Sequence, residues 1–134
     1  MVITSLLAGF LGLWLLGQSV LVMLMRRQLR VAIGNGAGKQ PLLERAMRAQ
    51  ANTAEYAPLL LILLGLAEMQ TGAMLLLAML AGIIAAGRVF HAIALLWTEP
   101  RDIKLGLNFR VAGMACTWTG LGILAGWALV VGLV

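Results

Sequence analysis

The sequence predicts an all-α integral membrane protein, a single domain over residues 1–134 built as a bundle of four transmembrane helices. Apolar residues make up 62% of the chain and charged residues 11%, which leaves too little polar surface to cover a soluble domain of this length. Four stretches reach the roughly 20 mostly apolar residues that a helix needs to cross a bilayer. They are residues 3–25, 46–69, 73–97 and 107–133. The runs LLLILLGLA and AMLLLAMLAGIIAAG show no alternation of apolar and polar residues, which argues against membrane β-strands.

The first stretch is expected to be a retained helix, because it lacks the basic segment and the small-residue cleavage pattern of a signal peptide. A glycine cluster at 34–38, followed by Pro41, predicts an irregular loop after it. The second helix is expected to begin near 41–44, in the headgroup region. Residues 70–72 predict a short turn into the third helix, and the Pro-interrupted stretch 98–106 predicts a turn into the fourth.

The positive charges predict how the chain is oriented in the membrane. The net charge is +5, and most cations lie in or beside the first and third connections. Four spans place both connections on one side, and their excess of Lys and Arg marks that side as cytoplasmic, with both termini opposite. Because the cations lie at helix ends without interleaved polar or aromatic surface, no nucleic-acid partner is expected.

Polar side chains interrupt two of the apolar stretches in a helical pattern. Arg48, Asn52 and Glu55 are spaced i, i+4, i+7, which keeps them within about 60° of arc on one helix face. Arg88 and His91, spaced i, i+3, share a face of the third helix in the same way. Both groups lie toward the cytoplasmic ends of their helices, so the two stripes are expected to meet at one depth.

Further cations surround this level, and they outnumber the one carboxylate, Glu55. Such an excess of positive charge is self-repelling unless an anion joins it, so the pattern predicts a site for a ligand with carboxylate or phosphate groups. The ligand's amine, where it has one, would face Glu55. The additional cations are Arg26 and Arg27 from the first helix and Arg101 or Lys104 before the fourth. The alternative interpretation is structural, with Arg48 and Arg88 reaching to headgroups, Glu55 paired to Arg88, and His91 as an interhelical hydrogen-bonding residue.

Motifs of soluble enzymes are missing. One His and one Cys cannot supply a tetrahedral metal set, so no metal is expected, and no nucleotide-binding loop or nucleophile elbow occurs. Cys116, within the last apolar stretch, is expected to be an inert packed thiol.

Three motifs resemble one known family, the membrane-associated proteins in eicosanoid and glutathione metabolism (MAPEG). They are RRQLRV at 26–31, ERAMRAQANTAEYAP at 44–58 and GRVFHA at 87–92. The resemblance implies a four-helix membrane protein that forms a homotrimer and binds glutathione between neighbouring subunits near the cytoplasmic face. The residues it implies for the glutathione site are Arg48, Asn52, Glu55, Tyr56, Arg88 and His91, with Arg26 from an adjacent subunit.

The resemblance also implies a reaction, nucleophilic transfer by the glutathione thiolate. An arginine near the start of the fourth helix would favour the thiolate, and Arg101 is the candidate, with Lys104 in reserve. The implied function is that of a glutathione-dependent transferase or peroxidase acting on lipophilic electrophiles or lipid hydroperoxides, in a bacterial inner membrane. The alternative is a non-catalytic lipid-binding or scaffold protein of the same fold, because Leu95 and Ala51 replace polar residues of characterised enzymes. A small four-helix transporter is disfavoured because the first helix offers only Gln18 in place of a carboxylate.

Overall fold

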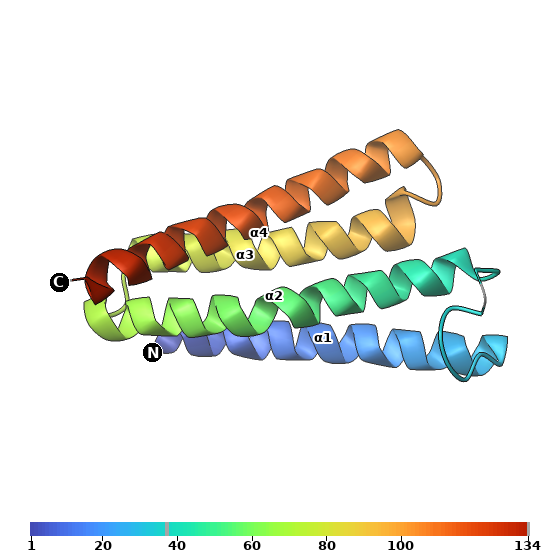
Figure 1. The fold of residues 1–134 in the computed structure, drawn as a ribbon, viewed down its shortest axis with the longest axis horizontal. Coiled ribbons are helices and arrows are strands. Elements are labelled where there is room, and N and C mark those ends of the chain that lie inside the picture. The colour runs from blue at the N-terminus through green and yellow to red at the C-terminus, as the bar shows by residue number, and fades with distance from the viewer. Residues whose placement is uncertain (37, 134) are drawn as a thin grey trace.

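The computed structural model describes residues 1–36 and 38–133, and long helices packed side by side account for most of them (Figure 1). The elements in chain order are α1 (Val2–Leu29), α2 (Pro41–Thr71), α3 (Leu75–Ile93), the short π-helix η1 (Ala94–Thr98) and α4 (Ile103–Gly132). Three segments, α1, α3 with η1, and α4, are each long and apolar enough to cross a membrane. The predicted class of an all-α integral membrane protein is confirmed. That α2 also spans the bilayer stays a prediction.

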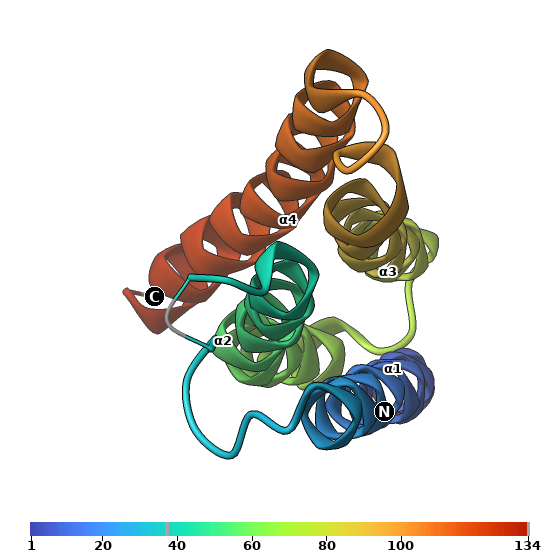
Figure 2. The same cartoon turned by 90° about the vertical axis from the view of Figure 1, so that its right-hand side faces the viewer.

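Both termini and the α2–α3 turn lie at one end of the bundle, while the α1–α2 connection and the turn before α4 lie at the other (Figure 1). The two connections rich in arginine and lysine therefore share one end, which we call the basic end. Figure 2 shows the bundle from this end, with α2 between α1 and α4. Within the described residues α1 packs on α2 and α3 and makes no contact with α4.

Local sequence explains where the helices begin and end. Pro41 occupies the first turn of α2, where its missing N–H costs nothing, and Gly72 ends that helix with a positive φ of 76°. The fourth helix begins at Ile103 rather than near 107, because Asp102 caps it and accepts a hydrogen bond from the backbone N–H of Leu105 at 3.0 Å. Because of this earlier start, the residues just before position 107 belong to α4 and not to the preceding turn.

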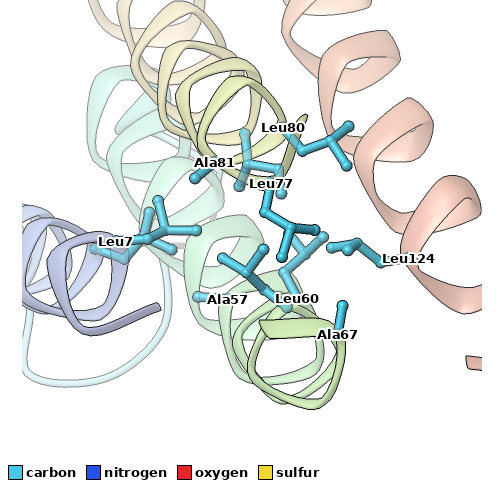
Figure 3. Close-up of a cluster of buried hydrophobic side chains, with 11 residues drawn as sticks. Leu7, Ala57, Leu60, Ala67, Leu77, Leu80, Ala81 and Leu124 are labelled. Atoms are coloured by element: carbon cyan, nitrogen blue, oxygen red, sulfur yellow. The ribbon is translucent and has the colours of Figure 1, made fainter. Parts of the chain in front are cut away.

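The apolar core joins all four helices. Leu7 of α1, Leu60 of α2, Leu80 of α3 and Leu124 of α4 belong to one buried cluster, and the labelled side chains of Figure 3 converge from these helices. Burial of such side chains fixes the helices against one another near the middle of the bundle. The basic end lies outside this cluster, so polar side chains there do not interrupt the apolar packing.

Three glycines of α4 bring that helix close to the α3–η1 segment. Gly106, Gly113 and Gly120 recur every two turns, and a Cβ on Gly113 would lie only 2.8 Å from the carbonyl oxygen of Gly87. The backbones of α3 and α4 therefore touch directly at this level. Gly122, by contrast, has no such neighbour within 4 Å in the chain.

Glu68 of α2 holds the start of α1 at the end opposite the basic end. Its carboxylate accepts hydrogen bonds from the backbone N–H groups of Ile3 at 3.0 Å and Thr4 at 2.8 Å, and from the Thr4 hydroxyl at 2.7 Å. The side chain is buried, and the Met1 ammonium group lies 3.7 Å from it. A negative charge at a helix N-terminus satisfies donors that have no partner inside the helix.

We expect Glu68→Gln to lower the melting temperature in detergent by roughly 5 °C, because the amide NH2 faces N–H donors that need an acceptor. Glu44→Gln is the matched control, since Glu44 is exposed on the same helix. Differential scanning fluorimetry on both variants measures the effect. Equal melting temperatures for the two variants would show that the Glu68 contacts contribute nothing.

Candidate functional site

A cavity of about 400 Å³ lies between α2, the α3–η1 segment and α4, toward the basic end. Its lining combines two arginines, a glutamate, an asparagine and a histidine with an apolar wall. The lining residues are Arg48, Ala51, Asn52 and Glu55 of α2, His91 of α3, Leu95 of η1, and Arg110, Val111, Met114 and Trp118 of α4. Charged groups and apolar surface thus face the same space.

The polar stripe of α2 supplies one wall. Arg48, Asn52 and Glu55 all line the cavity, as expected for residues on one helix face. Arg48 and Glu55 are exposed, and among the described residues neither forms an ion pair. Their charges are therefore available to a ligand of mixed charge.

The opposite wall comes from α4 and contains Arg110, which was not among the predicted site residues. Its Nη1 lies 3.5 Å from Oε2 of Glu99, and the other carboxylate oxygen of Glu99 lies 3.7 Å from Nη2 of Arg45. Glu99 thus links α2 to α4 beside the cavity. Arginine has five N–H donors, so this one pairing leaves others for a ligand. The sequence signal that could have identified Arg110 is its position two turns inside an apolar helix that Asp102 caps.

The third helix contributes one residue to the cavity and one behind it. His91 lines the cavity although its side chain is largely buried. Arg88 does not line it: its side chain is 1% exposed and donates hydrogen bonds to Asn52 and to Thr117. The direct contact between Gly87 and α4 explains this placement, since it directs the next residue into the α2–α4 interface.

Tyr56 also lies behind the cavity rather than in it. The Arg88 guanidinium carbon lies 5.4 Å from the centre of the Tyr56 ring, within the range of a cation–π interaction. The Tyr56 hydroxyl accepts a hydrogen bond from Nε1 of Trp118 at 3.3 Å. Tyr56 therefore joins the buried Arg88 to a residue of the cavity wall.

The remaining predicted residues lie elsewhere at the basic end. Arg26 of α1 donates to the carbonyl oxygen of Ala32 at 3.2 Å, and α1 does not reach α4 in this chain. Arg101 is exposed and donates to the carbonyl oxygen of Trp97 at 2.7 Å. Lys104 is exposed in the first turn of α4. None of these three cations lines the cavity within one chain.

Metal-binding side chains are not clustered in residues 1–36 and 38–133, where no three His, Cys, Asp or Glu side chains gather as a possible metal site. Cys116 is a free, partly buried thiol on α4.

The cavity is suited to a ligand with both anionic and cationic groups. Arg48 and Arg110 can each grip a carboxylate, Glu55 can pair with an ammonium group, and Asn52 adds hydrogen-bonding capacity. The apolar wall accommodates a second, lipophilic molecule or part of one.

Comparison with known proteins gives one match. A family model described as the MAPEG family matches residues 4–130, a range that includes every residue lining the cavity. No curated protein and no solved structure matches the chain. The resemblance predicted from the three sequence motifs is confirmed.

Proposed function

The chain belongs to the MAPEG family, and on that premise we propose that it is a membrane-bound glutathione-dependent transferase or peroxidase acting on lipophilic electrophiles or lipid hydroperoxides. The observation that carries the proposal is the meeting of Arg48, Arg110 and Glu55 at one cavity with an apolar wall. Glutathione has an ammonium group for Glu55, carboxylates for Arg48, and a thiol that reacts as the negatively charged thiolate, for Arg110.

In the proposed complex Glu55 pairs with the ammonium group of glutathione, while Arg48, Asn52 and His91 bind its carboxylate and amide groups. Tyr56 and Arg88 support this wall from behind. Arg26 completes the site from the neighbouring subunit of a homotrimer, and this proposal is supported by the observation that Arg26 does not line the cavity of its own chain.

We assign the thiolate-stabilising role to Arg110 instead of Arg101, because Arg110 lines the cavity. A guanidinium group beside the sulfur favours the charged form of the thiol. The thiolate then attacks the electrophile, a carbon–sulfur bond forms, and the leaving group departs with its electron pair.

We place the basic end in the cytoplasm, where glutathione is available, and both termini on the opposite side of a bacterial inner membrane. The lipophilic substrate reaches the apolar wall of the cavity from the bilayer. This arrangement separates the entry routes of the two substrates.

Glutathione is expected to raise the melting temperature of the purified protein in detergent, since a ligand of the native state stabilises it. Glu55→Gln should weaken glutathione affinity about 10-fold through loss of a charged hydrogen bond, while Glu44→Gln should bind like the wild type. Isothermal titration calorimetry measures both. A wild-type protein that does not bind millimolar glutathione would contradict the proposal.

A non-catalytic lipid-binding role is the second candidate, and the apolar wall favours it. Leu95, Val111, Met114 and Trp118 together form a surface that fits an acyl chain. This role predicts that a fatty acid or phospholipid raises the melting temperature while glutathione does not, so the same thermal experiment separates the two functions.

A further inference from the structure

Arg88 is a buried cation for which the described residues offer no carboxylate partner. A guanidinium removed from water is costly unless its donors are satisfied. Its Nη1 donates to the side-chain oxygen of Asn52 and to the Asn52 backbone carbonyl at 3.4 Å, and its Nη2 donates to the Thr117 hydroxyl. Its Nη2 also approaches the sulfur of Met114 at 3.8 Å, and among the described residues its Nε has no partner. Neutral acceptors therefore hold this charge, and two of them, Asn52 and Met114, also line the cavity.

The contacts determine which way the Asn52 carboxamide faces. A guanidinium group has only donors, so the atom of Asn52 directed at Arg88 must be the oxygen. The amide is planar, and its NH2 therefore points away from Arg88. Within the described part of the chain, the one partner of this NH2 is the sulfur of Met114 at 3.6 Å, a weak acceptor that itself lines the cavity. A ligand in the cavity thus meets hydrogen-bond donors from Asn52.

The hydroxyl of Thr117 is oriented in a similar way. It donates its hydrogen to the carbonyl oxygen of Gly113 at 3.0 Å, which leaves a lone pair for Arg88. The guanidinium is consequently fixed between α2 and α4, and it cannot turn without breaking bonds to both helices. Because the Arg88 guanidinium is held in place, the Asn52 side-chain amide bonded to it is held in place as well.

Aspartate at position 52 would have the same shape and would pair with Arg88 more strongly than asparagine does, because its negative charge adds an attraction between opposite charges to the hydrogen bond. It would, however, offer only acceptors to the cavity and would repel a carboxylate. The chain instead has a neutral amide beside a buried cation, which favours the ligand's acceptor groups at the expense of stability.

We propose that Arg88 is a positioning residue: it holds the Asn52 oxygen inward and thereby makes this wall of the cavity selective for a carboxylate or another acceptor group of the ligand. The identity of that ligand as glutathione rests on the proposed function. The orientation of Asn52 does not.

The test is Asn52→Asp, measured without and with glutathione. Without ligand, pairing with Arg88 should raise the melting temperature by about 2 °C or more. Glutathione affinity should fall about 10- to 100-fold, because a donor is lost and a repelling charge is gained. A merely structural role for Asn52 would move stability and affinity in the same direction. Thr53→Val is the control, since the buried Thr53 hydroxyl donates to the carbonyl of Ala49 in its own helix and has no other partner among the described residues. The glutathione affinity of Thr53→Val should match the wild type.

Arg88→Lys gives a second check, because an ammonium group lacks the planar fork that holds Asn52 and Thr117 together. Affinity should fall although residue 88 does not line the cavity, and unchanged affinity would overturn the positioning role.

An Asn52→Asp variant with no gain in melting temperature would overturn the inward orientation. A more stable Asn52→Asp that binds glutathione like the wild type would overturn the selectivity alone. Failure of the wild type to bind would instead overturn the proposed function, and the melting temperature of unliganded Asn52→Asp would still decide the orientation.

Discussion

Arg110→Ala is expected to lower the rate of glutathione conjugation to a lipophilic electrophile by about 100-fold, the scale of losing one charge-stabilising donor from an active site. Arg110 is the cation on the α4 wall of the cavity, and its removal raises the pKa of the bound thiol because the thiolate loses a neighbouring positive charge. The thiolate absorbance of bound glutathione should therefore appear at higher pH in the variant. Steady-state rates at saturating glutathione and an absorbance titration against pH measure the two effects.

Arg101→Ala and Lys104→Ala are the matched controls. Both side chains are exposed cations outside the cavity, so their removal should leave the rate within about 3-fold of the wild type, as for surface charges generally. A large loss in Arg101→Ala with an active Arg110→Ala would reverse the assignment. The role would then return to the residue that the family resemblance indicates.

Helical periodicity alone was sufficient to bring three site residues together. Arg48, Asn52 and Glu55 lie on one face of α2 because their spacing matches the helix repeat, and no tertiary information is needed for that. The bundle of apolar helices also follows from length and composition. Both predictions depend on properties of one segment at a time.

The positions of Arg110 and Arg88 could not be predicted from one segment at a time, because they depend on helix capping and on contacts between helices. Placing the start of the fourth helix near 107 left Arg110 beside a turn, whereas the Asp102 cap puts it two turns inside α4, where it pairs with Glu99 and lines the cavity. Arg88 and His91 share a helix face as predicted, but only His91 lines the cavity. Which of these two side chains reaches the cavity depends on how closely α3 and α4 pack against each other.

That closeness is set by Gly113, and Gly113→Val is expected to destabilise the protein by about 3 kcal/mol or more, the upper range for overpacked cores. A Cβ at Gly113 would lie 2.8 Å from both the carbonyl oxygen of Gly87 and the backbone nitrogen of His91, and neither backbone atom can move aside independently. The helices must separate, which removes Arg88 from Thr117 and widens the cavity. Melting temperature in detergent should fall by roughly 10 °C.

Gly122→Val is the control for Gly113→Val, because it adds the same side chain to the same helix where no neighbouring atom lies within 4 Å in the chain. Its melting temperature should stay near that of the wild type, and light scattering on the same samples shows whether an oligomer contact is affected. The glutathione response should be lost in Gly113→Val alone, since the cavity depends on the α3–α4 contact. Equal stability of the two variants would mean that α3 and α4 do not touch at Gly87 and Gly113, and the placement of Arg88 behind Asn52 would lose its structural cause.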